Sequence, residues 1–250
     1  MIIIRDEQKI ARLKRLSKWL STAGIVALVI GMILAFTSTT NALALQLVAL
    51  GFGWIFSQVG MYLAHRYVRD PRPDEVVDKA LGKVTRKGRL YHYLLPASHV
   101  LLMETGLIVI VAKYQGGKIS VENDKWQQKG LGMRKFFGQE NLGNPTREAE
   151  DSVKALAAYI HKHAPEIEEV PIGALIVFTA VEPKDLDLKG SQIPAMHHSK
   201  VKSYLRRKRR TQPLSDEYYN ALRAAFDLRA THLLTQDVDQ EVNDVKETES

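Results

Sequence analysis

Two long apolar runs near the start of the chain place the strongest limit on its fold. The first, WLSTAGIVALVIGMILAF, occupies residues 19–36, and the second, ALALQLVALGFGWIFSQVGMYLA, occupies residues 42–64; neither contains a charged residue. Each is long enough to cross a bilayer as a helix that rises about 1.5 Å per residue. Only TSTTN separates them, so we predict an antiparallel transmembrane hairpin over residues 19–68.

Basic residues flank this hairpin on one side only. Residues 1–18 form a basic, amphipathic segment, further basic residues follow the second run, and the link between the runs carries no charge. The positive-inside rule therefore predicts a multi-pass protein of the inner or plasma membrane with both termini in the cytoplasm. The flanking residues are Arg5, Lys9, Arg12, Lys14, Arg15, Lys18, His65, Arg66 and Arg69.

The first run also permits two other interpretations. NALA, at residues 41–44, offers an A-x-A-like cleavage site after a basic start, as in a secretory signal peptide. The apolar run is longer than a usual signal core, however, and a second run follows at once, which favours an uncleaved anchor. A hairpin buried inside a soluble protein is disfavoured because neither run has a polar face.

Small residues recur at every fourth position of both runs. Such ridges let helix backbones approach closely in lipid. We therefore expect the two helices to pack on each other, the alternative being a face for homo-oligomer formation. The residues are Ala23, Ala27, Gly31 and Ala35 in the first run and Ala49, Gly53 and Ser57 in the second.

Past the hairpin, the pattern alternates between helix and strand. Two prolines in RDPRPDEVVDK end the second membrane helix. The dipeptides PA and TG separate three strand-like runs, which predicts an antiparallel meander. The expected elements are a helix at 74–84, strands at 89–95, 98–104 and 107–113, a mobile loop at 125–143, a helix at 144–164 and a strand at 172–180.

The C-terminal part carries the strongest charge signal. A basic helix over residues 196–210 precedes a helix within residues 211–235, capped by Ser215, and an acidic, disordered tail at 236–250. The net charge of +7 indicates an acidic partner. The absence of cysteine excludes thiolate metal sites. Phosphate contact, to nucleic acid or anionic lipid, is expected through Lys200, Lys202, Arg206, Arg207, Lys208, Arg209 and Arg210. A solvated helix end is the alternative interpretation of this basic cluster.

Four features in order resemble the nuclease-related domain called NERD, from about Pro73 to Leu205. They are LYHYLLPASHVLLMETGLIVIVAKYQGGKI, then Trp126, then NPTREAEDSVKAL, then GALIVFT. The resemblance implies a restriction-endonuclease-like αβββαβ domain. Together with the anchor, it predicts an α/β protein: a transmembrane helical hairpin, a cytoplasmic domain over residues 73–210, and C-terminal helices.

The resemblance also implies a Mg²⁺-dependent nuclease site, which is degenerate here. The family typically has Ile-Asp-His on one strand, Glu-x-Lys on the next, a Gln after Asn-Pro and an acid in the first helix. Two carboxylates would hold Mg²⁺, and the lysine would support the attacking water. In this chain the corresponding residues are Ser98 for Asp, Val111 for Glu, Lys113 for Lys, Glu148 for Gln, and Glu75 or Asp74 for the early acid.

The loss of both strand carboxylates leads to a prediction of function. We expect a non-catalytic protein without a cofactor that binds or scaffolds at the cytoplasmic membrane face; the alternative is an active, membrane-tethered Mg²⁺ nuclease. Lys113 lacks its strand partner, and the helices offer Glu148 and Glu75 instead. His92 and His99 are expected to pair across the first hairpin.

The remaining histidine pairs are not expected to bind metal. His161 with His163, and His197 with His198, lack the i, i+4 spacing and the partner acids of a zinc site. We therefore predict surface histidines at these positions.

Overall fold

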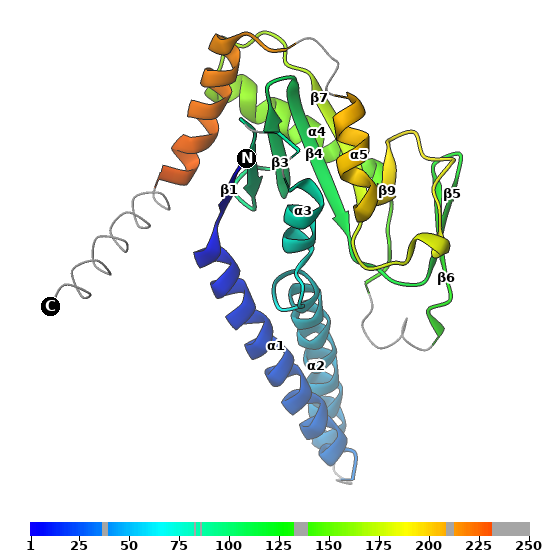
Figure 1. Cartoon of the computed structure of the whole chain (residues 1–250). Helices are drawn as coiled ribbons and strands as arrows, with labels where there is room; N and C mark the ends of the chain where they lie inside the picture. Colours follow the sequence, from blue (N-terminus) through cyan, green and yellow to red (C-terminus); the bar gives the residue numbers. More distant parts are fainter. Residues whose placement is uncertain (37–39, 83, 86, 133–139, 209–212, 232–250) are drawn as a thin grey trace, which may run out of the picture.

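The computed structural model describes residues 1–36, 40–82, 84–85, 87–132, 140–208 and 213–231. A helical hairpin stands on one end of an α/β domain (Figure 1). Its helices are α1 (Glu7–Leu34) and α2 (Thr40–Tyr67). Both are long and apolar enough to cross a membrane, and only 17% of the most apolar window of each is buried. The core helix of a soluble protein would be mostly buried, so this exposed apolar surface agrees with the predicted hairpin.

Small residues line the contact between α1 and α2. The hydroxyl of Ser17 donates to the carbonyl of Gly60 at 2.8 Å, and a Cβ on Gly24 would lie 2.5 Å from Ser57 Oγ. Packing within the hairpin is thus confirmed, but the contact does not include every small residue of the series, because Ala35 is exposed. A helix has about 3.6 residues per turn, so one face needs steps of both three and four residues.

The first residues of the chain belong to the domain and not to the anchor. Strand β1 (Ile2–Arg5) pairs in parallel with β2 (Arg89–His92). Asp6 then caps α1 by accepting from the backbone N of Lys9 at 2.7 Å. The prediction of one amphipathic segment over residues 1–18 was therefore wrong. Three consecutive isoleucines favour a strand. The strand they pair with, β2, lies more than 80 residues further along the chain, so nothing near them in the sequence indicated this pairing.

Six strands form the main sheet in the order β1-β2-β3-β4-β7-β9. The predicted meander of β2, β3 and β4 is antiparallel, and β7 then runs parallel to β4. The order α3-β2-β3-β4-α4-β7 matches the expected αβββαβ arrangement. The elements named here for the first time are α3 (Pro73–Leu81), β3 (His99–Met103), β4 (Gly106–Lys113), α4 (Pro145–His163), β7 (Ile172–Phe178) and β9 (Ala195–His197).

Helices cover both faces of this sheet (Figure 1). On one face, Val77 and Leu81 of α3 pack with Val201 of α5 (His198–Lys208). On the other, Leu156 of α4 packs with Phe226 of a C-terminal helix over residues 216–231. Ser215 caps that helix as predicted, because its hydroxyl accepts from the Tyr218 backbone N at 3.1 Å. The acidic tail at 236–250 lies outside the described residues.

A second, smaller sheet lies beside the main one. It consists of β5 (Lys118–Glu122), β6 (Lys125–Lys129) and β8 (Leu186–Asp187), which follows a short 3-10 turn at Pro183–Asp185. The predicted loop was therefore wrong for residues 125–129, while 133–139 are not described. Asn123 and Asp124 form the turn of this hairpin, with φ of 48° and 58°. Asn and Asp are residues that tolerate the positive φ of a tight hairpin turn, so these two residues were a signal for the hairpin in the sequence.

Candidate functional site

Four of the residues assigned from the family pattern meet at the C-terminal end of β4. Ser98, Val111, Lys113 and Glu148 line one polar cavity of about 50 Å³. A water molecule occupies about 30 Å³ in the liquid, so this cavity has room for one or two waters. It is too small for a nucleotide.

The acid beside Lys113 is Glu148. Lys113 is only 5% exposed, and its ammonium donates to Glu148 Oε2. Asn144 caps α4 by accepting from the Arg147 backbone N at 3.1 Å, which places Glu148 in the first helical turn, over the end of β4. An acid is also favourable there, near the positive end of the helix dipole.

The two strand positions that would hold Mg²⁺ supply no carboxylate. Val111 is buried and packs among the apolar residues around Ile176 and Phe178. The carbonyl of Ser98 accepts from the Tyr93 backbone N at 2.8 Å, and its side chain offers only a hydroxyl. Among the described residues that line the cavity, Glu148 is the only acid. The donor set therefore does not fit a magnesium site that needs two carboxylates.

The structure separates the two candidates for the early acid. Glu75 accepts from the Arg72 backbone N at 3.0 Å, so it closes the first turn of α3 and does not line the cavity. Asp74 is buried, lies 2.8 Å from Arg5 Nε, and accepts from the Tyr93 hydroxyl at 3.3 Å. Burial raises the pKa of the Asp74 carboxyl, and the charges of Arg5 and Arg72 offset part of that effect.

A buried network that includes the predicted histidine pair adjoins the cavity. His92 and His99 face each other with 2.7 Å between their Nδ1 atoms, and His92 Nε2 lies 2.8 Å from Asp78 Oδ1. Arg5 also contacts Asp78. Complete burial, reinforced by the charges of His92 and Arg5, lowers the pKa of His99, which therefore stays neutral near pH 7.

The pKa of Asp78 shifts in the opposite sense to that of Asp74. Burial opposes its ionisation, but the hydrogen bond from His92 and the charge of Arg5 hold the pKa of Asp78 below its ordinary value. The sequence predicted the histidine pair but had no signal for its link to Arg5, because Arg5 reaches it only through β1.

The basic cluster follows α5, with Lys200 and Lys202 near its start and Arg206 and Arg207 near its end. Lys200, Arg206 and Arg207 are exposed and Lys202 is half-buried, while Arg209, Arg210 and the side chain of Lys208 fall outside the described part. Helix α5 begins beside the Lys113 end of β4, since β9 pairs His197 with Phe178 and β4 pairs Lys113 with Phe178. It then runs away from the hairpin (Figure 1).

The chain after α5 confirms this direction. The Leu214 backbone N donates to the carbonyl of Glu104, in the turn between β3 and β4, at 2.7 Å. We call the end at this turn the far end of the domain, and the end next to the hairpin the anchor end.

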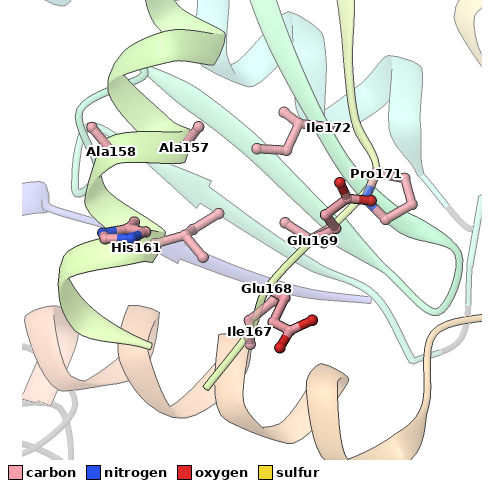
Figure 2. A pocket seen from close by; sticks show the side chains of 10 residues that line it. Ala157, Ala158, His161, Ile167, Glu168, Glu169, Pro171 and Ile172 are labelled. Atoms are coloured by element: carbon pink, nitrogen blue, oxygen red, sulfur yellow. The ribbon is translucent and has the colours of Figure 1, made fainter. Parts of the chain in front are cut away.

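A larger cavity, about 800 Å³, is an open groove between α4 and residues 167–172. Figure 2 shows alanines and isoleucines along it, with the His161 ring and the carboxylates of Glu168 and Glu169 on different sides. These groups do not converge. In the described part of the chain no three histidines or acids are placed to hold a metal ion.

The other histidines make local contacts. The ring of His163 stacks on Tyr159 with 4.3 Å between centroids, and His197 Nδ1 lies 2.8 Å from the Ser199 hydroxyl.

Comparison with known proteins finds a family model that matches the segment holding the site. Residues 83–179 match the family model NERD, the nuclease-related domain. The match runs from before β2 to the end of β7, so it includes Ser98, Val111, Lys113 and Glu148 but neither α3 nor α5. No curated protein and no solved structure matches the chain. The resemblance to NERD is confirmed over this segment.

Proposed function

We propose that this nuclease-related domain is membrane-anchored and binds a polyanion at the cytoplasmic face without cutting it. The observation that carries the proposal is the Lys113–Glu148 pair. Among the described residues that line the cavity, the only acid already pairs with the lysine, and Ser98 and Val111 stand where carboxylates would hold the metal. Phosphoryl transfer with Mg²⁺ depends on carboxylates and substrate phosphates around the ion.

The hairpin supports the membrane location. Its apolar surface is largely exposed, and Arg12, Lys14, Arg15 and Lys18 are exposed along the first turns of α1, where a cytoplasmic headgroup layer would lie. Strand β1 joins the domain sheet, so the N-terminus and the domain must share one side of the membrane. A reporter fused after residue 39 should therefore face away from one fused at Ser250, and a C-terminus outside the cytoplasm would overturn this orientation.

The position of the basic cluster favours nucleic acid over lipid as the polyanion. Helix α5 has 11 residues, so its C-terminal end lies about 16 Å farther from the anchor end than its start. Charges are largely screened beyond about 8 Å at physiological salt. Headgroups of the membrane that holds the hairpin therefore interact weakly with Arg206 and Arg207 at the end of α5, whereas a polymer in the cytoplasm reaches them freely.

The test uses the full chain in nanodiscs with neutral lipid. Replacing Arg206, Arg207, Lys208, Arg209 and Arg210 by glutamine should abolish binding of labelled single- and double-stranded nucleic acid, and wild-type binding should fall steeply with added salt. The matched control is Lys154→Gln with Lys162→Gln, two exposed cations of α4. Equal binding by both variants would assign the cluster to a solvated helix end. Loss of binding only to anionic vesicles would assign it to lipid.

An active nuclease is the alternative, and the retained Lys113 is the observation in its favour. The full chain should not cleave DNA or RNA with Mg²⁺ or Mn²⁺, because the cavity offers one paired carboxylate. Cleavage that disappears in Lys113→Ala would establish the alternative and refute the non-catalytic proposal.

A further inference from the structure

The end of α2 forms one wall of the cavity that holds Lys113. Arg66 and Tyr67, in the last turn of α2, line it together with Pro73 at the start of α3. Figure 1 shows α2 ending below α3 and the arrowhead of β4. The position that corresponds to a nuclease active site therefore faces the anchor and not the open side of the domain.

Successive residues of this segment contact different parts of the domain. The His65 ring stacks on Tyr114 with 5.3 Å between centroids, and Arg66 pairs with Glu140 at 3.1 Å. The Tyr67 ring lies 5.3 Å from that of Tyr93. Arg69 donates to the Tyr114 carbonyl at 3.2 Å.

Tyr93, which lines the cavity, contacts α1 as well as α2. Its carbonyl accepts from Lys9 Nζ of α1 at 2.9 Å, while its ring meets Tyr67 of α2. Its φ of 61° lies in the left-handed region, which is rare for a bulky residue and persists only where the surroundings impose it. Both membrane helices thus converge on one strained residue at the edge of the cavity.

Two polar side chains of the cavity are nearly inaccessible to solvent. Lys113 is 5% exposed and Gln115 is 1% exposed. Gln115 lines the same cavity, and its side-chain oxygen is buried without a hydrogen-bond partner, a cost that a solvated cleft would not impose. No phosphodiester can approach Lys113 while the end of α2 stays in place.

We propose that the end of α2 is a plug: it docks in the cleft that corresponds to a nuclease active site, and docking and access to Lys113 exclude each other. The same contacts hold the domain in one orientation on the hairpin, with its far end directed away from the membrane. Displacing α2 then opens the cleft and frees the domain to tilt. The inference does not depend on whether the basic cluster binds nucleic acid.

The test measures how fast each lysine reacts with an amine-specific reagent, by mass spectrometry of the full chain in nanodiscs. In the wild type, Lys113 should react far more slowly than the exposed Lys154. The variant Arg69→Ala/Glu140→Ala removes two ties that hold α2, together with the hydrogen bond from the Tyr114 hydroxyl to Glu140, but substitutes no residue of the cavity wall. It should speed the labelling of Lys113 by about tenfold, as for an easier local opening, with Lys154 unchanged.

The control is Phe52→Ala/Trp54→Ala, which alters exposed residues in the middle of α2 and should leave Lys113 slow. Fast labelling of Lys113 in the wild type would overturn the proposal, and so would slow labelling in a folded double variant. If the double variant does not fold, Arg69→Ala and Glu140→Ala singly give the same test, with a smaller acceleration expected of each.

Discussion

At the anchor end of the domain, charged side chains lie buried in pairs, whereas at the far end they stand exposed on α5. Arg5 contacts both Asp74 and Asp78, and Lys113 contacts Glu148. Arg206 and Arg207, by contrast, lie open to solvent. Charges that are desolvated and paired hold elements in place, while exposed cations remain free to meet a ligand. The comparison therefore separates a structural end from the end at which we propose binding, although both ends are rich in basic residues.

The largest effect should come from removing a cation at the anchor end. Arg5→Met leaves the buried Asp74 with a weaker partner, and breaking such a pair costs about 3 kcal/mol. Denaturant unfolding in detergent micelles measures the loss. Arg12→Met, an exposed cation of α1, is the control and should change stability by less than about 0.5 kcal/mol. Equal stability of the two variants would remove the distinction between the ends.

The next effect concerns acid. His99 must stay neutral in the folded protein, because burial and the charges of His92, Arg5 and Arg66 lower its pKa; Asp78 and Tyr93 also adjoin the pair. An unfolded chain takes up a proton there below about pH 6.5. Stability contributed by this site is therefore present above that pH and falls as the pH drops, by at most about 1.4 kcal/mol per unit. His99→Gln should flatten the pH dependence of unfolding between pH 7 and 5.

A smaller effect is expected at the Lys113 pair. Glu148→Gln leaves the buried ammonium with a neutral acceptor, but Glu148 is 46% exposed, so water compensates part of the loss. We expect a destabilisation of about 1 kcal/mol. Glu150→Gln, on the exposed side of the same helix, should be neutral in the same unfolding measurement. No difference between the two variants would mean that the pair contributes nothing to the fold.

The smallest change in stability should follow neutralisation of the far end. Replacing residues 206–210 by glutamine should alter unfolding by less than about 0.5 kcal/mol, because exposed charges contribute little. The same variant should lose polyanion binding. A large destabilisation would instead mean that these side chains stabilise the fold, as the paired charges at the anchor end do.

Local patterns predicted the parts of the molecule that neighbouring residues determine. The apolar runs specify the hairpin by length, and PA and TG specify the β2–β3–β4 meander. The caps at Asn144 and Ser215 follow from side chains that bond backbone groups three residues away. These features depend on helix and strand periodicity and on turn chemistry, which act over a few residues.

Tertiary structure decided which distant groups meet. The partner of Lys113 lies 35 positions along the chain, and Arg5 reaches Asp78 across 73 positions. The choice between Asp74 and Glu75, the closure of the cavity by α2 and the outward direction of α5 belong to the same class. Each depends on which apolar faces pack together and so on the free energy of the whole core. The sequence alone therefore predicted two apolar helices long enough to cross a membrane and a degenerate nuclease-like motif, and only the packing decided that the end of the second helix lies over the motif.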